Sequence, residues 1–229
     1  MDIEKLNISQ ARDKIREKPL DELPEILKLI EEDDRKGIKA LKGTILRRIR
    51  AEKDRIKKKD TLLYEERKLW RVGYKGIGGM DEVGRGPLAG PVVAACVVFE
   101  PGTYIDGVDD SKKLSPSKRD RLFHIIMKKA QVVGIGRVDS REIDVINIFN
   151  ATKKAMDQAL SQCISGIDFL LVDAMDSQFS VPYRSLVKGD QRSHSIAAAS
   201  IVAKVTRDRE MIKKHKEYPD YGFDKHKGY

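Results

Sequence analysis

Residues 80–91 read MDEVGRGPLAGP and lead directly into residues 92–99, which read VVAACVVF. The second stretch is uninterrupted and apolar, the pattern of a strand whose two faces are both covered. The first stretch places two adjacent carboxylates, Asp81 and Glu82, before a glycine-rich turn. A carboxylate beside a buried strand is costly unless a cation pairs with it, and a divalent metal ion is a common partner. These residues therefore predict a metal site at the end of a strand.

The turn Gly84-Arg85-Gly86 offers exposed backbone and a guanidinium beside this site. Such groups suit the phosphates of a nucleic acid. The adjacency of Asp81 and Glu82 raises a geometric problem, because consecutive side chains of a strand point to opposite faces. We therefore expect the strand to end or bulge here, which the two glycines would permit.

A third carboxylate, Asp173, follows the apolar run at residues 169–172. Open α/β sheets place their ligands beyond the carboxyl ends of strands, which makes Asp173 a candidate metal ligand. The alternative is that Asp173 caps a loop, the commoner role of an acid in this position.

A fourth carboxylate, Asp208, lies on a helix that we expect over residues 194–214. Helical periodicity places it inside the apolar stripe of that helix. A carboxylate on a core-facing stripe needs a partner, and a metal ion shared with the other acids would supply one. A salt bridge with Lys204, Arg207 or Arg209 is the alternative.

Four carboxylates from distant segments match the requirement of a two-metal site. In such a site one ion activates water and the other stabilises the leaving oxygen of an in-line displacement. Ligation by oxygen alone favours Mg²⁺ or Mn²⁺ over zinc. The four histidines do not cluster in the sequence, and it contains no P-loop, dinucleotide-binding or serine-nucleophile motif.

The expected elements divide into a helical part and an α/β part. Before residue 75 only helices are expected, over about residues 9–17 with Ser9 as N-cap, 21–30, 33–59 and 61–72. After residue 79, strands are expected up to Glu82 and over 91–99, 132–138, 169–172 and 185–188, alternating with helices over 118–129, 140–162 and 194–214. This order predicts an α/β fold, a sheet with helices packed on its faces, preceded by a small all-α domain.

The positive charge of the chain is concentrated before the opening motif. The formal net charge is +9, and residues 35–75 hold 16 basic and 5 acidic residues. Residues 1–34 are acidic by contrast, with 6 basic and 11 acidic residues. A basic stretch of this kind predicts nucleic-acid contact, because neutralised phosphates release condensed counterions. The alternative is a solvated helix face.

The sequence also indicates a compartment. No apolar run approaches the ~20 residues needed to cross a bilayer, and the charged N-terminus lacks the apolar segment of a secretory signal. Cys96 and Cys163 lie in apolar surroundings without metal-ligand spacing, which is typical of reduced core cysteines. We expect a soluble cytoplasmic protein with no membrane partner.

Several motifs together resemble the signature of ribonuclease HII, a type 2 ribonuclease H family. Between residues 76 and 229 they are DEVGRGPLAGPVVA at 81–94, DSKKLS at 110–115, VDA at 172–174, AKVTRD at 203–208 and YGFDKHKGY at 221–229. The resemblance implies a ribonuclease H-like mixed sheet flanked by helices. It implies an endonuclease that hydrolyses the RNA strand of RNA/DNA hybrids. It also implies nicking on the 5′ side of single ribonucleotides in duplex DNA, which leaves 3′-hydroxyl and 5′-phosphate ends.

The resemblance assigns roles by position. Two Mg²⁺ or Mn²⁺ ions would be held by Asp81, Glu82, Asp173 and Asp208. The turn would read the 2′-hydroxyl at the RNA–DNA junction through Gly84, Arg85 and Gly86, and this hydroxyl is the group that distinguishes RNA from DNA. Tyr229 would stack on the neighbouring deoxyribose, and Lys112 and Lys113 would lie near the phosphates.

The resemblance also suggests a domain organisation and two competing readings. Residues 1–72 would form a basic helical, substrate-binding accessory domain, and residues 73–229 the catalytic domain of a monomer. Family members usually continue past Lys-Gly-Tyr, so their C-terminal tail is expected to be absent here. The sibling ribonuclease HIII typically has Gly-Thr-Gly at the turn, so Arg85 favours ribonuclease HII. The other alternative is a non-catalytic protein that binds RNA/DNA hybrids.

Overall fold

The computed structural model describes residues 7–31, 33–175 and 177–229. The chain forms two compact units, residues 1–59 and 60–229. The functional boundary expected at residue 72 stays a prediction.

The first unit is a small helical bundle. Its helices are α1 (Ile8–Glu17), α2 (Leu23–Leu29) and most of α3 (Lys36–Leu62). Asn7, and not the expected Ser9, caps α1: Asn7 Oδ1 accepts a hydrogen bond from Gln10 N at 2.9 Å, and Gln10 Oε1 accepts one from Asn7 N at 3.2 Å. This reciprocal pair satisfies two N–H groups that a helix start leaves open, which a lone Ser9 hydroxyl could not do.

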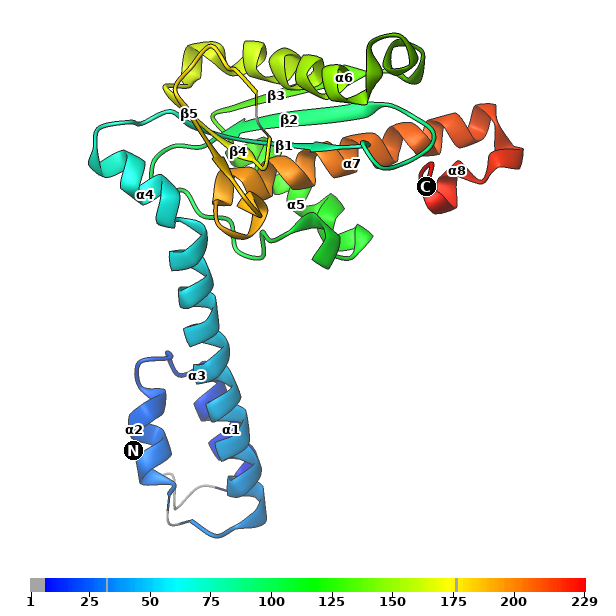
Figure 1. The fold of residues 1–229 in the computed structure, drawn as a ribbon. Helices are drawn as coiled ribbons and strands as arrows, with labels where there is room; N and C mark the ends of the chain where they lie inside the picture. Colours follow the sequence, from blue (N-terminus) through cyan, green and yellow to red (C-terminus); the bar gives the residue numbers. More distant parts are fainter. Residues whose placement is uncertain (1–6, 32, 176) are drawn as a thin grey trace. The chain divides into compact units, whose positions relative to one another are not determined.

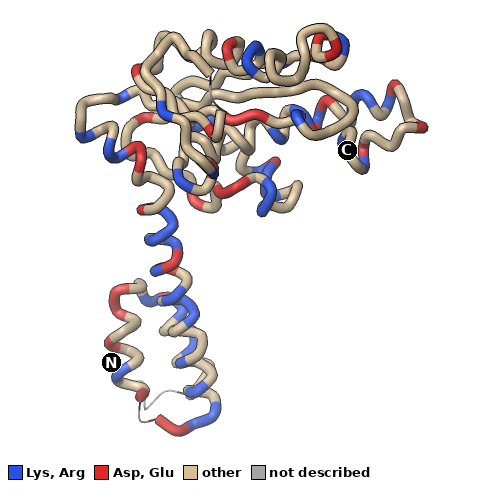
Figure 2. The backbone as a smooth tube through the Cα atoms, in the orientation of Figure 1, with Lys and Arg blue, Asp and Glu red and all other residues tan. Residues whose placement is uncertain are grey.

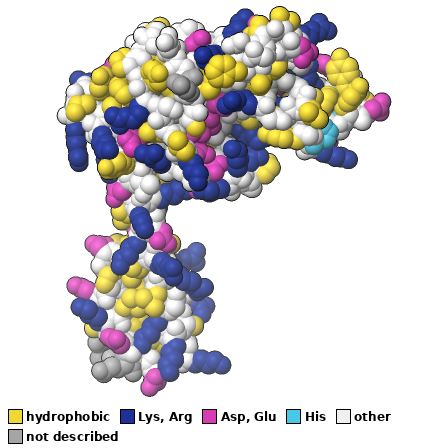
Figure 3. All heavy atoms as spheres, in the orientation of Figure 1, with side chains coloured by type: hydrophobic (Ala, Val, Ile, Leu, Met, Phe, Trp, Pro, Cys, Tyr) yellow, Lys and Arg dark blue, Asp and Glu magenta, His cyan; other side chains and the backbone are white. Residues whose placement is uncertain are grey.

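The core of this unit is thin and its α3 surface is basic. Eight apolar side chains are buried in it: Ala11, Ile15, Leu23, Ile26, Ile30, Ile38, Leu41 and Ile45. Lys and Arg recur along α3 (Figure 2), and in space-filling view they cover the α3 side of the unit (Figure 3). Residues 35–59 alone contain 12 basic and 2 acidic residues.

The second unit is built on a mixed five-stranded sheet with the order β3-β2-β1-β4-β5. The strands are β1 (Ile77–Val83), β2 (Val92–Val98), β3 (Val132–Val138), β4 (Phe169–Asp173) and β5 (Tyr183–Leu186). The neighbouring pairs β1–β2 and β2–β3 are antiparallel, whereas β1–β4 and β4–β5 are parallel. The predicted α/β class and mixed sheet are therefore confirmed.

Helices cover both faces of this sheet (Figure 1). One face packs against α6 (Ser140–Cys163) through residues such as Met80, Cys96 and Ala155. The other packs against α5 (Pro116–Lys129) and α7 (His194–Glu217) through residues such as Val97, Leu122 and Ile201. All seven residues of β2 are buried, as its uninterrupted apolar sequence predicts.

Two shorter helices complete the described part of the unit, α4 (Tyr64–Arg71) and α8 (Phe223–His226). Leu69 of α4 packs with Phe169 of β4 and Ile196 of α7. Cys96 and Cys163 are buried and free, as expected. In the described residues, no helix has the length and apolar character needed to span a membrane.

Candidate active site

Carboxylates gather where the three parallel strands of the sheet end. Strands β1, β4 and β5 run in the same direction, so their carboxyl ends lie at one edge, where α/β sheets place ligands. Asp81 lies near the end of β1 and Asp173 is the last residue of β4. Asp190 follows β5 in the 3₁₀ segment Gly189–Gln191.

The structure corrects one expectation at Asp81 and Glu82. Strand β1 neither ends nor bulges there, since it stays in register with β2 from Gly78 to Val83. Its pairing with β4 extends only to Met80, opposite Val172. Beyond that point β4 no longer pairs with β1, so no strand lies beside Glu82 on this edge. The Glu82 side chain leaves the strand on the face opposite to Asp81 and still lines the same pocket.

Asp81 is buried among other acids. One of its oxygens accepts a hydrogen bond from the Glu82 backbone N–H at 2.8 Å, and the Ser200 hydroxyl on α7 lines the same pocket and lowers the pKa of Asp81. Burial, followed by the negative charges of Glu82 and Asp173, raises the pKa of Asp81 to about 8. Asp81 therefore holds a proton at neutral pH unless a cation compensates the charge.

Asp173 is tied to the segment that carries Asp190. Asp173 Oδ1 accepts a hydrogen bond from the Gly189 backbone N–H at 2.7 Å. A Cβ on Gly189 would lie 3.3 Å from that oxygen and 2.7 Å from a methyl group of Ile196, so a larger residue there would require the Ile196 side chain to shift. Burial and the charges of Asp110 and Asp173 raise the pKa of Asp190 to about 6.

Asp190 was not among the predicted site residues. The rule that singled out Asp173, an acid beyond a strand end, would also have found it. The signal was weak because β5 is short and three of its four residues are exposed. Asp110, which caps the 3₁₀ segment Ser111–Lys113, was likewise assigned no role, although it is as buried as Asp190.

The acids at the ends of the parallel strands line one pocket of about 480 Å³. Four of its lining residues are carboxylates: Asp81, Glu82, Asp173 and Asp190. Its other polar and charged residues are Ser111, Lys112, Arg119, Ser200, Lys204 and Tyr229. We call it the acid pocket. The pKa values of Glu82 and Asp173 are raised as well, and burial is the largest cause of both shifts.

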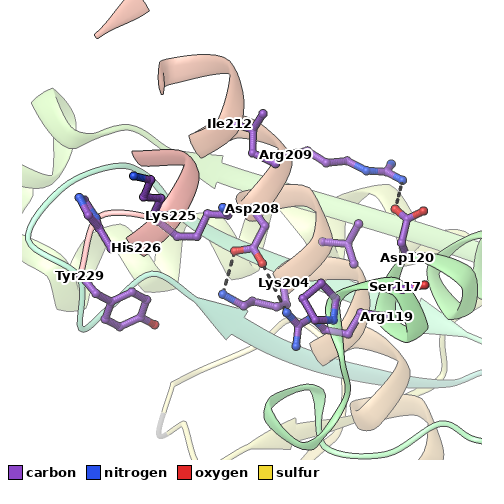
Figure 4. A pocket seen from close by; sticks show the side chains of 13 residues that line it. Ser117, Arg119, Asp120, Lys204, Asp208, Arg209, Ile212, Lys225, His226 and Tyr229 are labelled. Atoms are coloured by element: carbon purple, nitrogen blue, oxygen red, sulfur yellow. Dashed lines mark hydrogen bonds and ion pairs between the residues drawn. The ribbon is translucent and has the colours of Figure 1, made fainter. Parts of the chain in front are cut away.

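The structure does not bring Asp208 into the acid pocket. Asp208 lines a second cavity of about 600 Å³, shown in Figure 4. There Lys204 Nζ lies 2.7 Å from Asp208 Oδ1, and Arg119 lies 3.9 Å from Oδ2. The salt bridge left open as an alternative for Asp208 is thus formed, with Lys204 one helical turn earlier.

The remaining predicted residues are distributed around the acid pocket. Arg85 is exposed and donates to Glu82 Oε1 at 3.1 Å. Lys112 lines the pocket, whereas Lys113 is outside its lining and lies 3.9 Å from Asp109. Tyr229 lines the pocket too, and a Cβ on Gly86 would lie 4.0 Å from its ring. Gly84 lies in the same turn with φ of +103°, which favours glycine.

The donor set of the acid pocket fits a divalent cation. Within the described ranges, no three Asp, Glu, His or Cys side chains already form a group that could hold a metal ion. The carboxylates nevertheless raise one another's pKa values, and Mg²⁺ or Mn²⁺ would reverse that repulsion with the oxygen ligands these ions prefer. Asp81, Glu82, Asp173 and Asp190 are the residues that could hold such an ion.

Comparison with solved structures supports the fold. The ribonuclease H2 of Pyrococcus horikoshii OT3 superposes with a TM-score of 0.52 at 28% identity, covering 62% of this chain and 76% of that chain. The Mn²⁺ complex of Bst-RNase HIII superposes with a TM-score of 0.53 at 20% identity, covering 65% of this chain and 56% of that chain, and shares the fold.

Sequence comparison identifies the family. The model described as Ribonuclease HII matches residues 78–229. A ribonuclease HII of Geobacillus sp. (strain WCH70) is 47% identical over 209 residues, covering 91% of this chain and 76% of the relative. That of Clostridioides difficile (strain 630) is 44% identical, covering 97% of this chain and 88% of the relative. The chain therefore belongs to the ribonuclease HII family of metal-dependent ribonuclease H enzymes, whose cleavage leaves 5′-phosphate ends.

Proposed function

We propose that the chain hydrolyses the RNA strand of RNA/DNA hybrids and nicks duplex DNA on the 5′ side of single ribonucleotides. The observation that carries this proposal is the acid pocket, in which four carboxylates meet and burial raises the pKa of each. Two bound Mg²⁺ or Mn²⁺ ions would supply an activated water and stabilise the leaving oxygen. Asp81, Glu82, Asp173 and Asp190 would hold them.

In this proposal Asp190 replaces Asp208 as the fourth ligand. Asp190 shares the pocket with the other three acids, and the hydrogen bond from Gly189 to Asp173 fixes its segment against β4. Asp208 instead holds Lys204, whose ammonium lines both cavities. Lys204, Arg119 and Lys112, which all line the acid pocket, would then face phosphates of the substrate.

The surrounding residues prepare the pocket for a phosphodiester. The Glu82 N–H orients Asp81 before any substrate arrives. The Gly84–Gly86 turn would contact the 2′-hydroxyl of the ribonucleotide. Tyr229, whose exposed ring lies next to Gly86, would stack on the deoxyribose that follows. The sugar on the 3′ side of the scissile phosphate would thereby be distinguished from deoxyribose.

The test is cleavage of two duplexes by the full chain. One duplex is an RNA/DNA hybrid, and the other is DNA with one embedded ribonucleotide and a label at each end. With Mg²⁺ or Mn²⁺ we expect a nick 5′ of the ribonucleotide, with 3′-hydroxyl and 5′-phosphate ends, and no cut in all-DNA duplex. Binding without any metal-dependent nick would instead favour the non-catalytic hybrid-binding protein.

We further propose that the first unit strengthens substrate binding. The basic surface of α3 supports this role, since 11 of its residues between 36 and 59 are Lys or Arg. Deletion of residues 1–59 should weaken duplex binding and flatten its dependence on salt, because fewer counterions are released. Filter binding between low and moderate salt measures the slope, and an equal slope would leave α3 as a solvated helix.

A monomeric, cytoplasmic enzyme stays a prediction. The two buried, free cysteines support a reducing compartment.

A further inference from the structure

Arg207 is a fully buried arginine whose partners are all backbone carbonyls. It lies on α7 next to Asp208, and no part of it is exposed. Its Nε donates to Pro91 O, one terminal nitrogen to Ala89 O and the other to Lys227 O, each at 2.9 Å. Hydrogen bonds from a charged donor are roughly twice as strong as neutral ones, so this guanidinium binds its three partners firmly.

The three carbonyls belong to two segments that are far apart in the sequence. Ala89 and Pro91 close the turn that begins at Gly84, and Lys227 precedes Tyr229 by two residues. The same segments also meet directly, because the backbone N–H groups of Leu88 and Ala89 both donate to Gly228 O, at 2.9 and 3.2 Å. Two hydrogen bonds thus join the turn directly to the Tyr229 segment, and Arg207 bridges them with two hydrogen bonds to the turn and one to the Tyr229 segment.

One glycine gives the guanidinium its space, and a second lets the Tyr229 segment approach the turn. Gly84 and Gly228 have φ of +103° and +92°, conformations that other residues rarely adopt. A Cβ on Gly84 would lie 2.7 Å from Arg207 Nε and would also collide with Pro91 O. A Cβ on Gly228 would collide with Ala89 O. The packing therefore leaves little freedom in the distance between the turn and the Tyr229 segment.

We propose that Arg207 is a positioning residue for recognition of the RNA–DNA junction: it fixes the Gly84–Gly86 turn relative to Tyr229. This inference rests on the proposed function, in which the turn contacts the ribose and Tyr229 contacts the next deoxyribose. A single embedded ribonucleotide presents both sugars to the site. Most positions of an RNA/DNA hybrid present ribose at both places, so only the first substrate uses the full spacing that Arg207 sets.

Lysine cannot replace arginine in this role. The planar guanidinium presents N–H groups in three fixed directions, whereas the ammonium is a single point on a flexible chain. Arg207→Lys keeps the charge but would satisfy fewer of the three carbonyls. The turn and the Tyr229 segment would then move relative to each other while the acid pocket keeps all four carboxylates.

The first measurement is the ratio of kcat/KM for the single-ribonucleotide duplex to kcat/KM for the hybrid. For Arg207→Lys we expect this ratio to fall about tenfold, since misplaced contacts of this kind cost one to two orders of magnitude. A smaller folded fraction lowers both values equally and leaves the ratio unchanged. Arg137→Lys is the matched control. Arg137 lies on β3, pairs at the surface with Glu210 of α7, the helix that carries Arg207, and lines neither cavity.

The second measurement is hydrogen exchange at the Leu88 and Ala89 amides, which needs neither metal nor substrate. We expect faster exchange at both amides in Arg207→Lys and unchanged exchange in Arg137→Lys. Should Arg207→Lys not fold, Gly228→Ala disturbs the contact between the turn and the Tyr229 segment from the side of the Tyr229 segment. It should also lower the ratio of the two kcat/KM values.

The outcomes separate this inference from the proposed function. An unchanged ratio together with unchanged exchange, in a variant that still cleaves both duplexes, would overturn the role of Arg207 alone. If the unaltered chain cleaved neither duplex with Mg²⁺ or Mn²⁺, the proposed function would fail and the specificity role would fail with it.

Discussion

The acid pocket and the junction between α4 and α7 both bury carboxylates, but they surround them with different groups. At the α4–α7 junction, Glu66 is only 2% exposed. Its Oε1 accepts hydrogen bonds from the Ser193 hydroxyl at 2.7 Å, the Ser195 hydroxyl at 2.8 Å and the Ser195 N–H at 3.0 Å. In the acid pocket Asp81 is 8% exposed, and its charged neighbours include Glu82 and Asp173.

The difference distinguishes a structural acid from one that needs a ligand. Burial raises the pKa of both carboxyls, but at Glu66 every other cause is a hydrogen bond that lowers it. At Asp81 the neighbouring carboxylates raise the pKa further, to about 8. The protein supplies one oxygen of Glu66 with three donors. Asp81 instead has neighbouring carboxylates that raise its pKa, and a divalent cation would compensate their charges.

The largest effect is expected when one carboxylate of the acid pocket is removed. Asp190→Asn should lower kcat by more than about 100-fold with Mg²⁺, since even outer partners of metal ligands cost about 10–100-fold. Asp208→Asn should cost less than about tenfold, because it removes a salt bridge with Lys204 and not a metal ligand. Single-turnover cleavage of a labelled hybrid measures both.

Thermal melting of the two variants provides the control, since both must remain folded under the assay conditions. A loss of activity in Asp208→Asn equal to that in Asp190→Asn would return Asp208 to the metal site. Near-normal activity in Asp190→Asn would remove Asp190 from it.

The second prediction concerns the α4–α7 junction. Glu66→Ala should lower the free energy of unfolding by about 2–3 kcal/mol, because it leaves buried donors of Ser193 and Ser195 without an acceptor. Glu65→Ala should cost about 1 kcal/mol or less, since its partners Arg184 and Arg192 are about half exposed and water can solvate them. Urea unfolding followed by the fluorescence of Trp70, the single tryptophan, measures both.

Glu65 is a matched control because it is the neighbouring residue on α4 and nearly as buried as Glu66. Equal losses for the two alanine variants would mean that the donors around Glu66 do not distinguish it. Cleavage by folded Glu66→Ala should keep its metal dependence, in contrast to Asp190→Asn.

The sequence predicted much of the fold of the second unit because its core elements carry strong patterns. The expected strand at 132–138 is β3, and the expected start of a helix at residue 194 is the start of α7. In the first unit, α3 begins at Lys36 and not at Asp33. The Asp33 side chain instead accepts hydrogen bonds from the backbone and the guanidinium of Arg35, so Asp33 lies in the loop before the helix.

The site was harder to predict than the fold. Periodicity placed Asp208 on the correct helix, but it could not distinguish a metal ion from Lys204 as the partner. Asp190 follows a strand too short and too exposed to be recognised with certainty from its sequence. Arg207 stands in the polar run TRDRE and looks like a surface residue, because nothing local indicates that distant carbonyls enclose it. Long-range geometry decides all three.

The smallest expected effect is on stability, and it tests the acid pocket without any substrate. The pKa of Asp81 is about 8 in the folded protein and has an ordinary value of 3.8. Between these values the folded chain holds a proton that the unfolded chain has released, so the metal-free protein should lose stability as the pH rises. Asp81→Asn cannot titrate, and its stability should fall less. Relative to the unaltered protein it should gain at least about 1 kcal/mol between about pH 5 and pH 8.

Urea unfolding in EDTA at both pH values measures this change. Mg²⁺ at pH 8 should then stabilise the unaltered protein more than it stabilises Asp81→Asn. The cation compensates the negative charge of Asp81, and the variant has no such charge at this position. The slope will not vanish in the variant, since burial also raises the pKa values of Glu82, Asp173 and Asp190. Parallel pH profiles and equal stabilisation by Mg²⁺ would mean that the charge of Asp81 does not depend on a cation, and the contrast between the two regions would disappear.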